Sequence, residues 1–400
     1  MNIIMKAYCR TFQAAFCVAL PLLPYRDPKI IEHIEDIPDA LFSENNHKPL
    51  IVTDRTIRGL GLTEPLERSL RYAGMEYLIY DGVVANPTTV NVAEALDVYR
   101  RGGCDCIIAF GGGSPMDCAK GVGAMLARPK KTLGQLRGIL RVRRRTPTVI
   151  AIPTTAGTGS ETTVACVIVD SESRHKYAIN DFPLIPRYAV LDPAVTATLP
   201  SFVAATTGMD ALTHAVESYI GRSGNAGTRR DAIEAMKLIF ENLESAVSTG
   251  DEAARRNMLY AAHLAGRSFS KAYVGYVHAL AHALGGRYDT PHGLANAVIL
   301  PHVLREYGSA IHKKLRGIAI ECGLADASVS PEAAAELVIG KIEEMNERFG
   351  IPRTIGTIRA EDIAGMAEHA YHEANPLYPV PVLWDRAKLS EMYREVGGLS

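Results

Sequence analysis

Short apolar runs alternate with amphipathic helical patterns between residue 49 and about residue 192 of the chain. Apolar runs of about four to eight residues that end in polar turns predict strands, and apolar positions at helical spacing predict helices. The stripe of Val92, Ala95, Leu96 and Tyr99 is of the second kind. Strands that alternate with helices are typical of a parallel, doubly wound sheet. We predict strands at 49–54, 76–80, 105–110 and 148–152, helices at 64–73, 88–101 and 115–126, and an added β-ribbon at 163–170 and 176–180.

The pattern changes after residue 193, where strand patterns end and helical patterns continue almost to the C-terminus. A chain of 400 residues is too long for one ordinary core, since single cores rarely exceed about 250–300 residues. We therefore predict two domains, an α/β domain of residues 1–199 and an all-helical domain of residues 200–400. The pattern leaves the structure of residues 1–48 undefined. The clearest helices of the second domain are predicted at 204–219, 229–248, 252–270, 278–285 and 332–349.

Composition and charge indicate a globular protein and argue against two kinds of partner. Hydrophobic residues make up 47% of the chain and charged residues 22%, with a formal net charge of −1. Such a chain lacks the basic field that nucleic-acid binding requires, and the arginine-rich run at 137–145 is interpreted as a solvated surface loop. Apolar runs stay shorter than the roughly 18 residues of a membrane span, so no membrane partner is expected.

The cysteines and the N-terminal residues indicate in which cellular compartment the protein is expected. The seven cysteines follow no metal-type spacing, and free thiols in a reducing cytoplasm account for them. Lys6 and Arg10 precede an apolar stretch at 12–23, in the order of a secretory signal peptide. Gln13 and Pro21 interrupt that stretch, however, and no clear small-residue cleavage site follows. We expect a cytoplasmic protein.

Asp210, His214, His278 and His292 form a candidate metal site. Asp210 and His214 lie four residues apart, as do His278 and His282, and residues at that spacing share one face of a helix. Their neighbours are small and apolar, which predicts a buried position, and buried polar groups need partners. Any one of these histidines taken alone is more often a satisfied core or surface residue than a metal ligand. Together, one carboxylate and three imidazoles without a thiolate suit Fe²⁺, Zn²⁺, Co²⁺ or Mn²⁺.

Two polar loops follow predicted strands of the first half. The loop at 110–117 reads Phe-Gly-Gly-Gly-Ser-Pro-Met-Asp and opens a helix, so its backbone N–H groups can bind a pyrophosphate. The loop at 153–161 is rich in threonine and glycine and supplies neutral donors. Asp54 ends the first clear strand, where a carboxylate accepts from ribose hydroxyls and repels a 2′-phosphate. Each has a structural alternative. The loop at 110–117 could be a plain glycine-rich turn, the loop at 153–161 could be a flexible surface turn, and Asp54 could cap the helix that follows it.

Together these segments resemble the iron-containing (group III) alcohol dehydrogenase family. The resemblance is carried by the segments at 111–120, 153–161, 208–217 and 278–293, in the family's order, and it extends from about residue 50 to residue 400. It implies a dehydroquinate synthase-like fold, in which an α/β coenzyme domain and a helical metal domain flank the active site. Residues 1–48 depart from the family's usual opening strands and glycine-rich turn.

The resemblance also implies roles for individual residues. Asp210, His214, His278 and His292 would bind the metal, with Fe²⁺ as the first choice and Zn²⁺ as the alternative. His282 would lie near the substrate and assist proton movement. NAD is implied rather than NADP, and the assembly would be a homodimer or a larger homo-oligomer. The dinucleotide would contact Asp54, Asn86, Gly112, Gly113, Ser114, Asp117, Thr154, Thr155, Thr158 and Lys176.

The implied function is a metal-dependent, NAD(H)-linked alcohol dehydrogenase or aldehyde reductase that acts on a small alcohol, diol or aldehyde. A metal- and NAD-dependent lyase of the 3-dehydroquinate synthase type is the nearest alternative, followed by a glycerol dehydrogenase and by a non-catalytic scaffold. The metal segments carry mostly Ala, Leu, Gly and Tyr, which favours a small, weakly polar substrate over a phosphorylated acid. Tyr219, Phe269, Tyr273 and Tyr276 are candidates for the substrate pocket or for the core.

Overall fold

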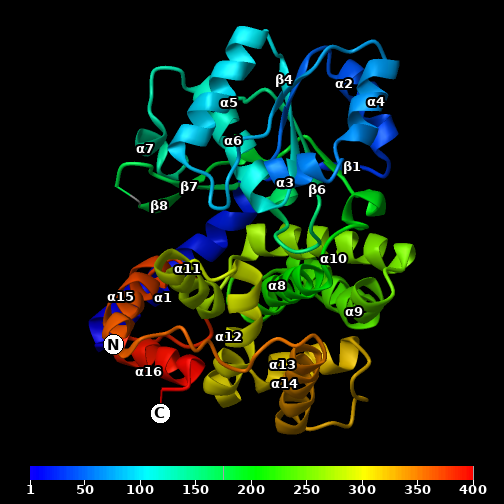
Figure 1. Cartoon of the computed structure of the whole chain (residues 1–400). Coiled ribbons are helices and arrows are strands. Elements are labelled where there is room, and N and C mark those ends of the chain that lie inside the picture. Colours follow the sequence, from blue (N-terminus) through cyan, green and yellow to red (C-terminus); the bar gives the residue numbers. More distant parts are fainter. Residues whose placement is uncertain (174, 400) are drawn as a thin grey trace. The chain divides into compact units, whose positions relative to one another are not determined.

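The computed structural model describes residues 1–173 and 175–399 and divides into two compact units, shown in Figure 1. The α/β unit consists of residues 24–199, and the helical unit consists of residues 1–23 and 200–400. The division after Leu199 falls where the sequence pattern places it. The first 23 residues differ from the expected division, because they pack with the helical unit.

The α/β unit is built on a six-stranded sheet in which every neighbouring pair is parallel. The predicted parallel, doubly wound architecture is therefore confirmed. The strands at 29–31 and 188–190 were not predicted. In spatial order the strands are β1 (Lys29–Ile31), β9 (Tyr188–Val190), β6 (Thr148–Pro153), β4 (Cys106–Gly111), β2 (Pro49–Val52) and β3 (Leu78–Tyr80).

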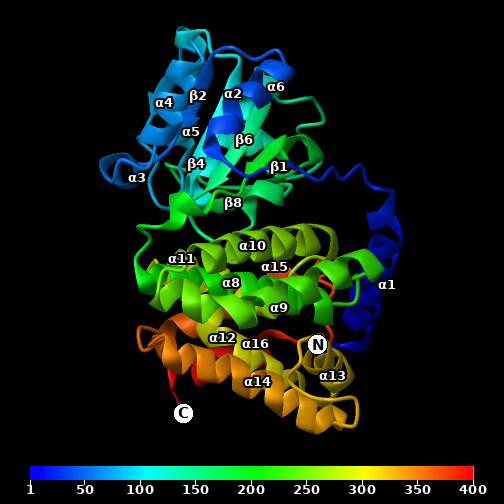
Figure 2. The same cartoon turned by 90° about the vertical axis from the view of Figure 1, so that its right-hand side faces the viewer.

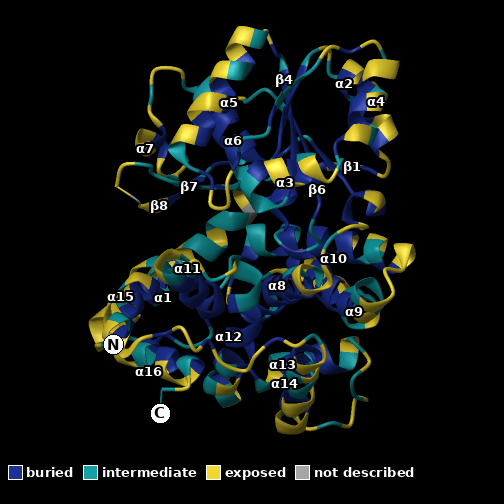
Figure 3. Cartoon of the chain, viewed as in Figure 1, coloured by how far each residue is buried: buried dark blue, intermediate teal, exposed yellow. Residues whose placement is uncertain are grey.

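Side-chain alternation along the strands produces two apolar layers. On β4, Ile107 and Ala109 belong to the cluster that includes α5 and α6, whereas Ile108 and Phe110 belong to the cluster that includes α2 and α4. The views of Figures 1 and 3 show these two helix pairs on opposite sides of the buried sheet. The helices of this unit are α2 (Ile37–Ser43), α3 (Arg55–Gly59), α4 (Glu64–Tyr72), α5 (Thr89–Gly102), α6 (Gly113–Ala127) and α7 (Leu133–Leu136).

A second, three-stranded sheet has the order β5–β8–β7. Strands β7 (Ala165–Val169) and β8 (Lys176–Asn180) pair antiparallel, which confirms the predicted ribbon. Strand β5 (Gly138–Ile139) pairs parallel to β8. It lies within the arginine-rich run that was interpreted as a surface loop, so that interpretation missed a short strand.

The helical unit is organised around α8 (Ser201–Ile220), which is buried along most of its length and packs against α9, α10 and α12. The helix that begins at His292 contains Pro301 and was not among the clearest predictions. Among the described residues, no helix is long and apolar enough to cross a membrane. The remaining helices that follow α8 are α9 (Ala226–Ser248), α10 (Glu252–Ala272), α11 (Tyr276–Tyr288), α12 (His292–Tyr307), α13 (His312–Glu321), α14 (Pro331–Arg348), α15 (Ile363–Ala374) and α16 (Arg386–Gly397).

The N-terminal stretch that resembles a signal peptide forms helix α1 (Ile3–Ala19), which lies against the helical unit in Figure 2. Arg10 donates hydrogen bonds to the carbonyl oxygens of Val380 and Pro381, at 2.7 and 2.8 Å. Gln13 is buried and donates to the carbonyl oxygen of Tyr378 at 2.7 Å. Long-range polar contacts of this kind are not visible in sequence patterns, which explains why the structure of residues 1–48 was left undefined.

Lys120 connects α6 to the loop that follows β6. Its ammonium group is buried and donates to three carbonyl oxygens, those of Ser160, Thr163 and Ala165, at 2.6–3.2 Å. It also donates to the hydroxyl oxygens of Ser160 and Thr163, at 3.1 and 2.8 Å. A buried cation with this many oxygen partners is well satisfied, so it keeps the two polar loops in register.

Replacing Lys120 with Met should destabilise the protein by roughly 2–3 kcal/mol, because buried oxygen acceptors would lose their donor. The matched control is Lys48→Met, since Lys48 pairs with the exposed Glu76 and its loss should change stability little. Denaturant unfolding followed by circular dichroism measures both variants. Equal midpoints for the two would contradict the role assigned to Lys120.

Candidate metal centre and coenzyme loops

Helix α8 supplies the first two candidate ligands. Asp210 and His214 lie one turn apart in its buried segment and are only 1% and 4% exposed. Small or apolar neighbours such as Ala211 and Leu212 let the helix pack closely on all sides. The i, i+4 spacing places the carboxylate and the imidazole on the same face, as the sequence predicts.

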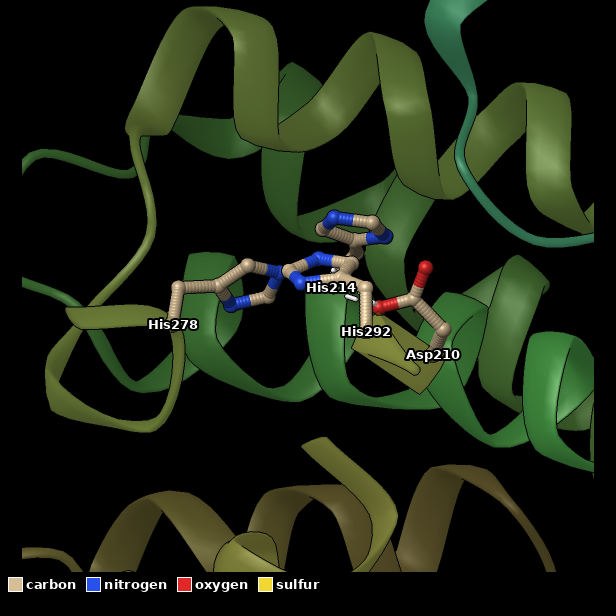
Figure 4. Close-up of side chains that lie close together, drawn as sticks. All are labelled: Asp210, His214, His278 and His292. Atoms are coloured by element: carbon tan, nitrogen blue, oxygen red, sulfur yellow. Dashed lines mark ion pairs between the residues drawn. The ribbon is translucent and has the colours of Figure 1, made fainter. Parts of the chain in front are cut away.

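His278 lies in the first turns of α11, and His292 is the first residue of α12. Figure 4 shows these side chains and those of α8 converging on one point. Asp210 Oδ1 lies 3.6 Å from His292 Nε2 and 3.9 Å from His278 Nε2. All four ligand atoms lie within 4.8 Å of one another. The structure therefore brings together the four side chains that the sequence singles out.

This geometry fits a bound divalent cation. Ligand atoms that each lie about 2.0–2.2 Å from a metal such as Zn²⁺ must be roughly 3–4 Å from one another, as several of these are. Burial holds the pKa of His278 well below its ordinary value, so its imidazole is neutral and has a lone pair for a cation. The carboxylate of Asp210 is buried among imidazoles, which is a setting that suits a bound cation.

Asn296 is a member of this cluster that sequence reasoning missed. It is fully buried, and its Nδ2 lies 2.6 Å from Asp210 Oδ1, 3.2 Å from His278 Nε2 and 3.1 Å from His292 Nε2. The available indication was its place one turn after His292 on the same helix. An amide that reaches three of the candidate ligand atoms helps to set their spacing.

Glu217 orients His278 from the side opposite the cluster. Its Oε2 lies 2.6 Å from His278 Nδ1, which leaves Nε2 facing the other ligands. Its carboxylate also accepts hydrogen bonds from the backbone N–H groups of Gly275 and Val277, at 2.9 and 2.8 Å. Burial raises the pKa of Glu217 to about 7. Its position three residues after His214 was an indication of this role that the sequence reading did not use.

His282, the predicted proton relay, borders the cluster. Its ring stacks on that of His292 with centroids 5.1 Å apart, and its Nδ1 lies 2.6 Å from Glu373 Oε1. Tyr378 Oη donates to the same Glu373 oxygen at 2.7 Å. Neither Glu373 nor Tyr378 was predicted, because they lie about ninety residues further along the chain and carry no motif. The contacts leave Nε2 of His282 as the nitrogen that faces away from the carboxylate.

Three of the four aromatic candidates for the pocket have clearly different environments. The ring of Phe269 stacks on that of His214 with centroids 4.1 Å apart, so it borders the metal cluster. Tyr276 is fully buried and stacks on Trp384 at 4.7 Å, which makes it a core residue. The ring of Tyr273 lies 6.4 Å from that of Tyr378.

The two polar loops of the α/β unit lie against each other. A Cβ added at Gly112 would lie 3.6 Å from Thr155 Oγ1, and one added at Gly113 would lie 3.4 Å from Thr158 Cγ2. The backbone of Gly112 precedes the first turn of α6, where unpaired N–H groups and the helix dipole favour an anion. Thr155 Oγ1 is buried and has no hydrogen-bond partner among the described residues. These loops therefore offer donors that suit a phosphate group.

Other predicted coenzyme residues hold the loops in place. Asp117 is half-buried, and its carboxylate accepts from the backbone N–H of Val167 at 3.2 Å and from Ser160 Oγ at 3.3 Å. Burial raises the pKa of Asp117 to about 6. The backbone N–H of Thr154 donates to the carbonyl oxygen of Gly111 at 3.1 Å, where β4 ends. Contact of these residues with a dinucleotide stays a prediction.

Asn86, Lys176 and Asp54 complete the predicted coenzyme set. Lys176 Nζ donates to Asn86 Oδ1 at 2.8 Å, so two residues ninety positions apart in the chain lie in contact. Asn86 has a φ of 56°, a left-handed conformation that asparagine tolerates. Asp54 is half-buried and caps α3 by accepting from the backbone N–H of Ile57 at 2.9 Å. The capping alternative is therefore present, and it occupies one carboxylate oxygen.

Comparison with known proteins adds independent findings. A family model described as "Iron-containing alcohol dehydrogenase" matches residues 31–193, and one described as "Fe-containing alcohol dehydrogenase family, C-terminal" matches residues 204–396. The chain is 40% identical to a 1,3-propanediol dehydrogenase of Citrobacter freundii over 354 residues, which cover 87% of this chain and 91% of that protein.

Two solved structures are similar over almost their whole length. The crystal structure of a 1,3-propanediol oxidoreductase matches with a TM-score of 0.89 and 37% identity, covering 93% of this chain and 99% of that one. A sulfoacetaldehyde reductase of Bifidobacterium kashiwanohense in complex with NAD⁺ matches with a TM-score of 0.83 and 25% identity, covering 94% and 99%. The fold and the order of the segments are thus shared with these proteins.

Gly293→Ala should weaken metal binding. A Cβ at this position would lie 2.5 Å from the backbone oxygen of Thr206, so α12 would move away from α8 and take His292 with it. Gly340→Ala is the control, since it adds a Cβ in open space within α14 and should stabilise that helix by about 0.5–1 kcal/mol. Titration with Co²⁺, followed by its visible absorption, compares the two variants, and unchanged affinity in Gly293→Ala would contradict the close approach of these helices.

Proposed function

The chain belongs to the iron-containing alcohol dehydrogenase family, and we propose that it is an NAD(H)-linked, Fe²⁺-dependent dehydrogenase of a short alcohol or diol. Its activity as an alcohol dehydrogenase or aldehyde reductase on small substrates follows from the family and from its relatives. The observation that carries the proposed mechanism is the convergence of Asp210, His214, His278 and His292 within 4.8 Å.

When bound, the metal would be a Lewis acid toward the substrate oxygen, and the nicotinamide ring of the coenzyme would exchange a hydride with the substrate carbon. The chain's own residues place and support them. Asp210 contributes the negative charge that retains the cation, and Glu217 orients His278 through the 2.6 Å contact. Phe269 covers the ring of His214 and limits the access of water to that ligand.

His282 is proposed to take up the proton of the substrate hydroxyl in oxidation and to return it in reduction. Its Nδ1 is engaged by Glu373, so Nε2 is the nitrogen that exchanges the proton. Glu373 is an acceptor both for His282 and for the Tyr378 hydroxyl, and both contacts hold the imidazole in one orientation. A relay with a fixed ring needs no reorientation during the reaction.

The coenzyme is proposed to bind the loops at 110–117 and 153–161, with Asp54 favouring NAD over NADP. The paired glycines and the unpartnered Thr155 hydroxyl support a pyrophosphate site. A relative in the comparisons was solved with NAD⁺. Fe²⁺ is proposed over Zn²⁺ on the family's description alone, since the donor set suits both. A cytoplasmic location and a homodimeric assembly are proposed on the same basis, with all seven cysteines free in the structure.

His278→Ala should remove both bound metal and turnover, because one ligand and the contact to Glu217 are lost together. The control is His302→Ala, which alters a histidine on α12 that pairs with Glu395 instead. NADH formation with 1,3-propanediol and metal analysis of the same samples give the result. Steady NADH formation by the unaltered protein separates a dehydrogenase from a dehydroquinate synthase-type lyase, and full activity with unchanged metal in His278→Ala would refute the ligand assignment.

Asp54→Asn should relax the preference for NAD. Asparagine caps a helix as well as aspartate does, so α3 should remain intact while the negative charge is removed. The ratio of kcat/KM with NADP to that with NAD should rise by about tenfold or more, which corresponds to roughly 1.4 kcal/mol of relieved repulsion. An unchanged ratio in a variant with an unchanged unfolding midpoint would show that Asp54 does not select the coenzyme.

A further inference from the structure

Helix α1 precedes both segments that match the family models, residues 31–193 and 204–396. Its inner face includes polar side chains: Gln13 is 4% exposed beside the buried Cys9, and Arg10 is half-buried. Apolar Ile4 and Tyr8, in contrast, are 78% and 55% exposed. Burial of apolar surface alone does not account for this orientation, so hydrogen bonds of the inward polar side chains contribute to it.

Those hydrogen bonds are concentrated on one irregular segment, the residues 376–381 between α15 and α16. Arg10 donates to the carbonyl oxygens of Val380 and Pro381, and Gln13 donates to that of Tyr378 at 2.7 Å. Within and around the segment, the carbonyl oxygen of Tyr378 also accepts from the backbone N–H of Val380, and that of Pro379 accepts from the backbone N–H of Arg222, both at 2.8 Å. For Val380 and Pro381 the side chain of Arg10 is a donor, so α1 contributes to fixing the conformation of this segment.

Aromatic contacts reinforce the same connection. The ring of Phe16 on α1 meets that of Tyr273 edge-on at 5.1 Å, and Tyr273 lies 6.4 Å from the ring of Tyr378. Tyr273 has a φ of 63° and a ψ of 174°, a conformation that is strained for any residue with a side chain. Such strain persists only where surrounding contacts require it, and the contacts here are those of α1 and the segment at 376–381.

Tyr378 connects this segment to the histidine network. Its hydroxyl donates to Glu373 Oε1 at 2.7 Å, and the same oxygen lies 2.6 Å from His282 Nδ1. We propose that α1 is a positioning element for the reaction: Arg10 and Gln13 fix the segment at 376–381, so that Tyr378 and Glu373 orient His282. This inference rests on the proposed function, in which His282 exchanges the substrate proton.

The double variant Arg10→Met/Gln13→Leu tests this role in the full chain. Both substitutions keep an aliphatic stem in place and remove the side-chain donors to the segment. The matched control is Lys6→Met/Thr11→Leu, which alters exposed positions of the same helix. In the test variant kcat should fall by about tenfold or more, because small displacements of catalytic groups are costly. Metal content and the KM for NAD should stay unchanged, and the control should match the unaltered protein.

A double-mutant cycle with Tyr378→Phe distinguishes positioning from general stabilisation. If α1 acts through the Tyr378 hydroxyl, removing its donors in the Tyr378→Phe background should change kcat by less than twofold. Multiplicative losses would overturn the proposal, as would an unchanged kcat in the double variant. If Arg10→Met/Gln13→Leu folds poorly, the single variant Gln13→Leu takes its place. It removes the hydrogen bond to the carbonyl oxygen of Tyr378, and the same changes in kcat decide the outcome.

Amide hydrogen exchange separates the failure of this inference from the failure of the proposed function. Residues that follow position 376 should exchange faster in Arg10→Met/Gln13→Leu than in the control, whether or not the protein oxidises alcohols. An unaltered protein that binds metal but reduces no NAD would refute the function and leave this exchange result standing. Unchanged exchange in an active enzyme would refute the role of α1 alone.

Discussion

The carboxylate of Asp210 is the constraint on which the helical unit depends. It is 1% exposed, accepts a hydrogen bond from Asn296 and lies among the imidazoles of His278 and His292, and three helices converge to enclose it. The sequence of α8 is adapted to that approach through small residues. On α12, Gly293 also allows the two helices to approach closely, because the backbone of α8 leaves no room for a Cβ at this position. The packing of this unit therefore follows from the site that it encloses.

Each group of the site is oriented by a second residue. His278 depends on Glu217, His282 depends on Glu373, and Glu373 in turn accepts from Tyr378. Supporting contacts of this kind determine which nitrogen of a histidine faces the reaction. The α/β unit shows a similar arrangement, since the ammonium group of Lys120 donates hydrogen bonds to oxygen atoms of the loop after β6. Function in both units thus rests on buried polar contacts within otherwise apolar cores.

Sequence reasoning succeeded where the chemistry is local. The i, i+4 spacing of Asp210 and His214 and the glycine-rich loop after β4 are complete within a few residues, so their patterns predict the local structure. It failed where partners are distant or elements are short. Strand β1 has three residues, and its pairing with β9 is known only once the sheet is assembled. Glu373 is about ninety residues from His282, and no pattern relates the two.

The most direct test of the central claim is anomalous X-ray diffraction at the absorption edge of the metal found in the purified protein. One strong peak should lie about 2.0–2.2 Å from an oxygen of Asp210 and from a nitrogen of each of His214, His278 and His292. A peak elsewhere in a fully loaded, active crystal, or the absence of these four side chains from its coordination shell, would contradict the account.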